Sequence, residues 1–203
     1  MHNLLMTTKK MTKQNYHHGD LAASLIQAAV SLLRENGPAS LSLREVARVA
    51  GVSHGAPAHH FGDKVGLLTA VATEGHDLLA VALRKSQVEK VSAMSRLVAA
   101  GKAYVKFAID QPAYFTVMFQ FDLINCDDPE FIRAGFLTKQ VLEDCVREMD
   151  RDVPANKKQI QSKVISLWSQ VHGFATLWKM GSFGNPADRE LLESLLSEMM
   201  PDE

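Results

Sequence analysis

The sequence has few cysteines and no long apolar run. Two cysteines among 203 residues are too few for a disulfide framework. A redox-sensing pair of Cys126 and Cys145 stays open beside the commoner use of cysteine as a small buried side chain. Without about 18 consecutive apolar residues, a membrane-spanning helix is not expected. The first apolar patch, Leu4-Leu5-Met6, is too short for a signal peptide, so we expect a cytoplasmic location.

Motifs that mark common enzymes are also missing from the sequence. It contains no Gly-rich phosphate loop, no nucleophile elbow and no His-Glu-x-x-His zinc motif. The acidic residues between positions 122 and 130 are typical of a solvated loop. The adjacent histidines His17-His18 and His59-His60 would diverge by about 100° on a helix, which disfavours a shared zinc ion. We therefore expect no catalytic residues, no cofactor and no metal.

Charge is divided unevenly along the chain. Residues 1–66 hold seven Lys and Arg but four Asp and Glu, whereas the remainder holds 15 and 19. Six of the eight histidines also fall in the first part. A basic head on an acidic body suits a domain that binds nucleic acid. Lys9, Lys10 and Lys13 indicate that residues 1–15 are a flexible basic tail.

Helical periodicity dominates the sequence, and no segment alternates as a strand would. Leu21, Leu25 and Ala29 share one face of a first helix over residues 18–36, which Gly37-Pro38 should end. Asp63 should cap a long fourth helix that runs into the eighties. Five more helices are expected over residues 92–110, 113–121, 129–150, 156–180 and 186–200. The sequence therefore predicts an all-α protein of about nine helices.

Residues 41–61 are typical of a helix-turn-helix. Ser42 with Glu45 three residues later forms a capping box at the start of the first short helix. Gly51 allows positive φ in the turn, and Ser53 is expected to cap the second short helix. Helix N-termini such as these attract phosphate groups, and the polar side of the second helix can enter the DNA major groove.

Four short segments surround this motif. They are Tyr16-His-His-Gly-Asp20, Leu-Ser-Leu-Arg-Glu-Val-Ala from Leu41, Ala-Gly-Val-Ser-His-Gly-Ala-Pro from Ala50, and His-His-Phe-Gly-Asp-Lys from His59. Together they resemble the DNA-binding domain of the tetracycline-repressor (TetR) family. A later segment, Trp168-Ser-Gln-Val-His172-Gly173, resembles the Trp/His/Gly pattern of one C-terminal domain class in that family.

The resemblance implies a bacterial, homodimeric regulator, usually a repressor that a small ligand releases from its DNA operator. Residues 16–70 would form a three-helix DNA-binding domain, and residues 71–203 a ligand-binding and dimerisation domain. Their boundary would lie inside the fourth helix, within residues 66–72. The residues expected at the DNA are Ser42, Arg44, Ser53, His54, Gly55, Pro57, His59, His60 and Lys64. For His54 and His59, exposed polar residues without a DNA role remain an open alternative.

One position departs from the family pattern. The family usually has Tyr in the recognition helix just before the final His-Phe, where this chain has Ala58. Because that Tyr commonly reaches a DNA phosphate, its role is not transferred to Ala58. A partner-binding protein that kept the scaffold but lost DNA binding is therefore the alternative to a regulator, and an enzyme is a remote third.

The helix expected over residues 156–180 is apolar on more than one side, as a helix buried on two sides would be. One side could face a ligand pocket and the other a partner subunit, with the last helix completing half of a four-helix dimer interface. An aromatic and Met cluster near residues 107–121 suits an adaptable pocket but equally an ordinary core. The candidate ligand-binding residues are Phe107, Tyr114, Met118, Phe121, Trp168 and His172. A structural, hydrogen-bonded role for His172 also stays open.

Overall fold

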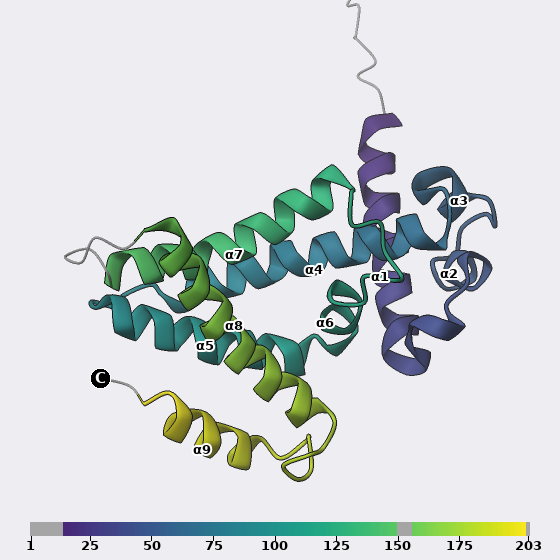
Figure 1. The fold of residues 1–203 in the computed structure, drawn as a ribbon. Helices are drawn as coiled ribbons and strands as arrows, with labels where there is room; N and C mark the ends of the chain where they lie inside the picture. The colour runs from purple at the N-terminus through teal and green to yellow at the C-terminus, as the bar shows by residue number, and fades with distance from the viewer. Residues whose placement is uncertain (1–13, 150–155, 202–203) are drawn as a thin grey trace, which may run out of the picture.

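The computed structural model describes residues 14–149 and 156–201, with side chains from Leu21 onward (Figure 1). Most of the expected basic tail, residues 1–15, lies outside the described residues. Nine helices and no strand make up the described ranges, which confirms the all-α prediction. The helices are α1 (Gln14–Ser40), α2 (Leu43–Val49), α3 (Ala56–Phe61), α4 (Lys64–Ser86), α5 (Ala93–Asp110), α6 (Pro112–Met118), α7 (Pro129–Met149), α8 (Lys157–Lys179) and α9 (Arg189–Met199).

Most helix ends fall where local sequence signals place them. Gly37 takes a φ of 71°, which interrupts the straight part of α1 near its expected end, although one further turn continues through Pro38 to Ser40. The end of α4 lies at Ser86, inside the predicted range. Two predictions are too long: α6 ends at Met118, and α9 begins after Asp188, whose side chain accepts a hydrogen bond from the Leu191 N–H at 2.9 Å.

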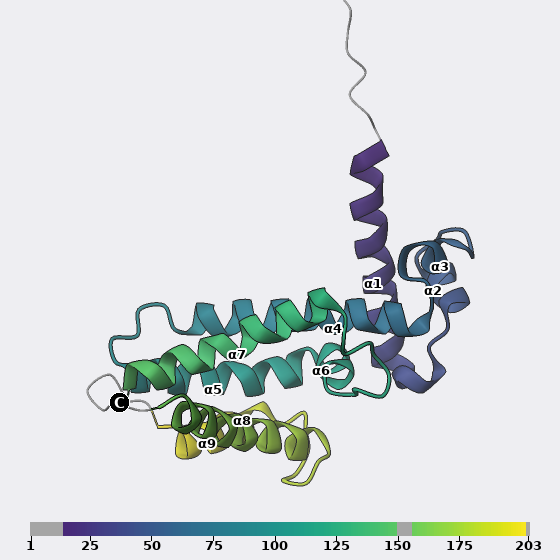
Figure 2. The ribbon, with the colours of Figure 1, turned by 45° about the horizontal axis from the view of Figure 1, so that its top comes forward.

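The helices form a small head and a larger layered body. In Figure 2, α1, α2 and α3 lie at one end of α4, while α4 and α7 lie above α5, and α8 and α9 lie below it. Helix α6 lies beneath α4, between α5 and the head, and contacts α1, α4 and α5. A single hydrophobic core runs from Leu25 and Val46 in the head to Trp178 and Leu192 in the body. Movements in the body can therefore be passed to the head through packed side chains.

Helix α4 belongs to both the head and the body. Its composition would allow a membrane span, but half of the apolar stretch is buried in the protein, as in a core helix of a globular protein. A Cβ added at Gly75 would lie 2.7 Å from the Met118 Sδ atom, so this glycine lets α6 approach α4 closely. Both predicted domains therefore pack on one continuous helix.

A polar junction joins α1, α4 and α6. The Gln27 Nε2 atom donates to the Tyr114 hydroxyl at 2.9 Å and to the Glu74 Oε1 atom at 2.8 Å. The Tyr114 hydroxyl donates to the same carboxylate oxygen at 2.5 Å. Burial, followed by this carboxylate, raises the pKa of Tyr114. Tyr114 thus joins the head to the body, and its role as a ligand contact remains a prediction.

Candidate DNA interface and ligand cavities

Helices α2 and α3 form the predicted helix-turn-helix. The Ser42 hydroxyl accepts from the Glu45 N–H at 3.3 Å, and Gly51 takes a φ of 67° in the turn. Val46 and Ala47 are fully buried beneath the two helices. The Glu45 carboxylate binds the Arg48 guanidinium at 2.6 Å, so the side-chain half of the expected capping box goes to an ion pair instead. The motif is confirmed, with this change at its first cap.

The expected start of the recognition helix α3 is wrong. Ser53 was predicted to cap it, but the helix begins at Ala56 with Gly55 as its N-cap. The Ser53 carbonyl accepts from the Ala56 N–H at 3.0 Å in the preceding turn. Pro57 explains the later start, because its fixed φ and missing N–H suit the first turn of a helix.

Most of the residues predicted to contact DNA lie at the surface of the head. The exposed ones are Ser42, Arg44, Ser53, His54, Gly55 and His59. Ala58 is also exposed, while His60 and Lys64 are half-buried. Pro57 is buried, so its prediction as a DNA contact is corrected to a packing role in α3.

The end of α3 is held tightly against the start of α4. The Asp63 carboxylate accepts from the Gly66 N–H at 2.8 Å, which confirms the predicted cap of α4. A Cβ added at Gly66 would lie 1.9 Å from the Phe61 carbonyl oxygen. The Lys64 Nζ atom donates to the Ala39 carbonyl at 3.1 Å, tying α4 to the end of α1. The recognition helix is therefore positioned by backbone contacts rather than by a loose linker.

Among the apolar cavities of the body, two adjoin each other. The first, of about 470 Å³, is lined from α4, α5, α7, α8 and α9, with Tyr104 and Gln170 among its residues. The second, of about 250 Å³, lies between α4, α7 and α8 beside the segment after α6. Leu83 and Leu142 line both cavities, so the two are neighbours.

Three of the six predicted ligand residues lie at or beside these cavities. Phe121 and Trp168 line the second cavity, and His172 contacts the Trp168 ring with 6.1 Å between ring centroids. Phe107 and Met118 are buried and line neither of these two cavities, so their role at a ligand remains a prediction, as it does for Tyr114. An aromatic and Met cluster fills a helical core as readily as a pocket.

The sequence analysis missed Tyr104, which lines the first cavity and links it to the second. The Trp168 Nε1 atom donates to the Tyr104 hydroxyl at 3.1 Å, and that hydroxyl lies 2.8 Å from the His172 Nδ1 atom. An indole nitrogen only donates, so the Tyr104 hydroxyl is free to donate onward to a neutral His172. Burial and the nearby Lys179 lower the pKa of His172, which favours the same neutral form. Tyr104 lies 64 and 68 residues from these partners, so no local pattern in the sequence indicated the pairing.

Comparison with known proteins identifies the family. Residues 25–71 match the family described as bacterial regulatory proteins of the tetR family, and residues 97–199 match the tetracyclin repressor-like C-terminal domain. The second match covers half of the chain. The chain belongs to the TetR family of transcriptional regulators. Its helix-turn-helix is a DNA-binding domain, and the resemblance seen in the sequence is confirmed.

Relatives of this TetR-family regulator carry the same kind of name. An HTH-type transcriptional repressor of Mycobacterium tuberculosis is 41% identical over 69 residues, which cover 32% of this chain and 37% of that protein. The HTH-type transcriptional regulator BetI of Klebsiella pneumoniae is 29% identical over 181 residues, covering 87% and 90% of the two chains. A solved structure of a protein of unknown function from Rhodococcus sp. RHA1 is 30% identical, with a TM-score of 0.74 and coverage of 93% and 97%. Two of these three proteins are named as transcriptional regulators, and none of the three is named as an enzyme.

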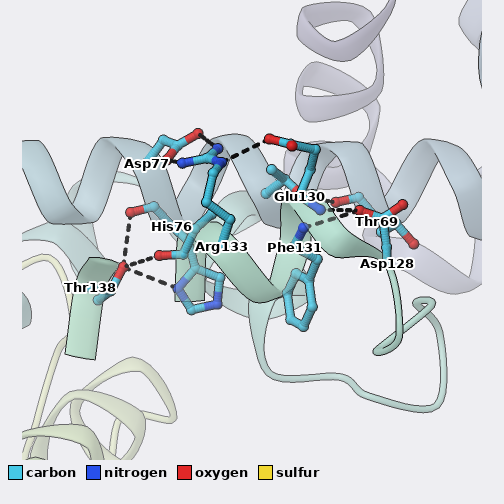
Figure 3. A network of polar contacts seen from close by, with 10 residues as sticks. Thr69, His76, Asp77, Asp128, Glu130, Phe131, Arg133 and Thr138 are labelled. Carbon is cyan, nitrogen blue, oxygen red and sulfur yellow. Dashed lines mark hydrogen bonds and ion pairs between the residues drawn. The ribbon is translucent and has the colours of Figure 1, made fainter. Parts of the chain in front are cut away.

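In this TetR-family regulator, α4 and α7 are joined by a polar network (Figure 3). The Arg133 guanidinium binds both Asp77 oxygens, at 3.0 and 2.8 Å, and also the Glu130 carboxylate at 2.7 Å. The Thr138 hydroxyl donates to the His76 carbonyl at 3.0 Å and lies 3.3 Å from the His76 Nδ1 atom. Because His76 and Thr138 also line the second cavity, any ligand there would press directly on the contact between α4 and α7.

Proposed function

We propose that the protein is a homodimeric repressor that binds an operator through α3 and is released by a small molecule bound in its body. Residues 16–70 form the DNA-binding domain in this proposal, and residues 71–203 form the ligand-binding and dimerisation domain. The observation that carries it is an exposed surface at the recognition helix: His54 is exposed in the turn before α3, and Ala58 and His59 are exposed on α3. Buried Val46 and Ala47 hold the helix rigidly behind that face.

Phosphate contacts come from the flanks of the recognition helix. Ser42 is exposed at the start of α2, and Lys64 lies half-exposed at the start of α4. Both positions are helix N-termini, where backbone N–H groups and the helix dipole favour an anion. Arg44 is exposed on the first turn of α2 and adds a positive charge there. These contacts fix the register, and His54 and His59 read base edges in the major groove.

The dimer interface is proposed on α8 and α9, which lie on the same side of the body (Figure 2). Ile165, Leu177 and Met180 are exposed on α8 at 50%, 43% and 74% of their surfaces. Gly173 lies between them at helical spacing, and a Cβ added there would meet nothing within 4 Å in the single chain. Exposed apolar side chains that gather on one helix in this way are consistent with an association surface. A twofold dimer would place two recognition helices at half-sites about one helical turn or more apart.

Release by a ligand follows from the position of α4. Leu83 of α4 lines both cavities, and the same helix begins beside α3 at Lys64. A ligand that separates α4 from α7 would therefore shift the recognition helices of the dimer relative to their half-sites. Operators lie on the genome, so the protein acts in the cytoplasm of a bacterial cell.

A gel-shift titration on the DNA upstream of the protein's own gene tests the proposal. We expect a discrete complex containing two chains, with much weaker binding to random DNA of equal length. The second candidate, a partner-binding protein on the same scaffold, is favoured by Ala58, which lacks the hydroxyl of the usual Tyr. Equal affinity for the upstream and the random DNA in the titration would favour that candidate, as would the absence of specific sites in genomic footprinting.

Substituting Ala58→Tyr should tighten operator binding about tenfold or more. A neutral phosphate hydrogen bond contributes about 1 kcal/mol, and a dimer makes it twice. Ala58 is exposed, so Tyr needs no room in the core and thermal stability should be nearly unchanged. Titration of both variants against one operator at fixed salt measures the effect. Unchanged or weaker binding would show instead that Ala58 lets the helix approach the bases and that Tyr obstructs it.

Substituting Lys64→Ala should weaken binding to specific and random DNA by a similar factor. A phosphate contact carries no sequence information, and its loss should reduce the salt dependence of binding by about one charge. Binding isotherms at several salt concentrations give this slope. Lys64 also donates to the Ala39 carbonyl, so a Lys64→Met variant controls for packing by keeping the long side chain without the charge. A loss confined to one DNA sequence would rule out a phosphate contact.

A further inference from the structure

The second cavity has apolar walls and one charged residue. Phe119, Phe131, Leu142 and Val164 are among its lining residues, and Lys139 is the single Lys, Arg, Asp or Glu that lines it. His76 also lines it, but burial lowers the pKa of this imidazole to about 4, so it is neutral at pH 7. The cavity therefore offers apolar contact along its walls and a positive charge at one place.

Two of the polar side chains that line the cavity, Thr138 and Trp168, already have partners. The single hydrogen of the Thr138 hydroxyl lies within reach of the His76 and Ala134 carbonyls, at 3.0 and 3.2 Å. The Trp168 indole N–H donates to the Tyr104 hydroxyl at 3.1 Å. A polar group placed deep in the cavity would lose its water without gaining these hydrogen bonds, which is costly. The enclosed part of a ligand must consequently be apolar.

Lys139 lies at the rim of the cavity, because it both lines the cavity and is exposed. The carboxylate nearest to it along α7 is Glu143, one turn further on, and this group binds the Arg147 guanidinium at 2.5 Å. In residues 14–149 and 156–201, no ion pair occupies the Lys139 ammonium group. It is thus available to an anion that arrives with its apolar part in the cavity.

We propose that the ligand of the second cavity is an apolar acid, with its hydrocarbon body inside and its carboxylate at Lys139. A cavity of about 250 Å³ has room for about eight methylene-sized groups, since a water molecule of similar size takes about 30 Å³. A medium-chain carboxylate such as octanoate therefore fits in size and charge. This inference rests on the proposed ligand-released repressor and names the chemical class of its ligand. The body of the acid would lie against His76 and Thr138, at the contact between α4 and α7.

Trp168 provides a direct signal for binding. Its ring lines the second cavity. Trp178, the other tryptophan, is 2% exposed and lines neither the first nor the second cavity. Titration of the full-length dimer with octanoate at pH 7 should change the tryptophan fluorescence saturably. 1-Octanol and octylamine, which have the same chain but no negative charge, should bind at least about fivefold more weakly. A Trp168→Phe variant should lose the signal, which assigns it to the cavity.

Substitutions of Lys139 separate charge recognition from simple apolar binding. Lys139→Ala should weaken octanoate about fivefold or more and leave 1-octanol unchanged, and Lys139→Glu should make octylamine the better ligand. Lys157→Ala, on an exposed lysine that lines neither large cavity, is the matched control and should change nothing. Octanol binding as tightly as octanoate, or octanoate binding that ignores Lys139, would overturn the proposal. The absence of any saturable signal with octanoate would overturn it as well.

Operator binding by the same preparations separates this inference from the proposed function. Octanoate that binds through Lys139 should weaken the operator complex by the same factor by which operator DNA weakens octanoate binding, because such coupling is reciprocal. Intact operator binding without octanoate binding would contradict the proposed apolar-acid ligand and leave the proposed repressor function standing. Octanoate binding through Lys139 without any specific DNA binding would contradict the proposed repressor function and leave the proposed ligand site standing.

Discussion

A Gly173→Arg substitution is expected to convert the dimer into folded monomers and to weaken operator binding at least about a hundredfold. In the single chain a Cβ at Gly173 meets nothing within 4 Å, so the arginine has room and the chain should fold. Arg also favours a helix more than Gly does. In the proposed dimer the same position faces the partner's α8, where an unpaired guanidinium would be buried among apolar side chains at high cost. The loss of a linked second half-site typically removes a factor of about 10²–10⁴ in affinity.

Sedimentation at about 10 μM and an operator titration measure the two parts of this result. Val81→Arg is the matched control, because Val81 is also a helical position with room for an arginine, being 61% exposed. Val81 lies on α4, away from the α8 face, and lines neither of the two cavities. The control should remain a dimer and keep its operator affinity. If the Gly173→Arg protein stays dimeric, the dimer interface does not lie on this face of α8.

Acidification is expected to destabilise the fold by about 3 kcal/mol through His76 alone. This imidazole projects from α4 and is buried against the rings of Phe119 and Phe131. Burial lowers its pKa to about 4, while the charge of Asp77 opposes the shift. In the unfolded chain His76 has its ordinary pKa of about 6.5, so it is protonated below that pH. In the folded chain it stays neutral until the pH falls to about 4. Stability is therefore fully retained above pH 6.5 and falls as the pH drops through this window. Burial lowers the pKa of His172 too, which adds a contribution of the same sign.

Denaturant unfolding of the wild type and His76→Phe at pH 7 and pH 4.5 checks this result. The ring of Phe fits the edge-on contacts with Phe119 and Phe131, and the Thr138 hydroxyl keeps its backbone acceptors. The variant should lose markedly less stability at pH 4.5 than the wild type, with His76→Gln as a second variant should Phe disturb packing. His59→Phe, on an exposed histidine of α3, should behave as the wild type. Equal acid losses in the wild type and in His76→Phe would remove His76 as the cause.

Local chain signals predicted the helices and the motif well. Ser42 and Asp63 cap their helices because capping depends on a side chain and an N–H group three residues away. Gly51 has positive φ because the tight turn after α2 requires it. The start of α3 was wrong because Ser53 satisfied the sequence rule while Pro57, four residues later, set the first turn. The local sequence therefore offers two N-cap positions for α3, Ser53 and Gly55, and only the structure shows which one is used.

The body was less predictable because its function depends on contacts between distant residues. Tyr114 was assigned to a pocket, yet its partners Gln27 and Glu74 come from two other helices and hold it in a junction. Tyr104 was missed, although it joins Trp168 and His172 from 64 and 68 residues away. Periodicity places such residues on an apolar face but cannot say whether that face is filled or hollow. The cavities themselves follow from how α4, α7 and α8 pack.

Specific recognition of DNA by the exposed face of α3 is the central claim, and one competition measurement tests it most directly. Fluorescence anisotropy would compare the gene's upstream DNA with random DNA of equal length, using the wild type and a His54→Ala/His59→Ala variant. The wild type should bind the upstream DNA about a thousandfold or more tightly than random DNA. The variant should fall towards the random-DNA affinity while keeping the salt dependence that the positive charges of Arg44 and Lys64 are proposed to supply through phosphate contacts. Equal affinity of the wild type for both DNAs would contradict a sequence-specific repressor on this scaffold.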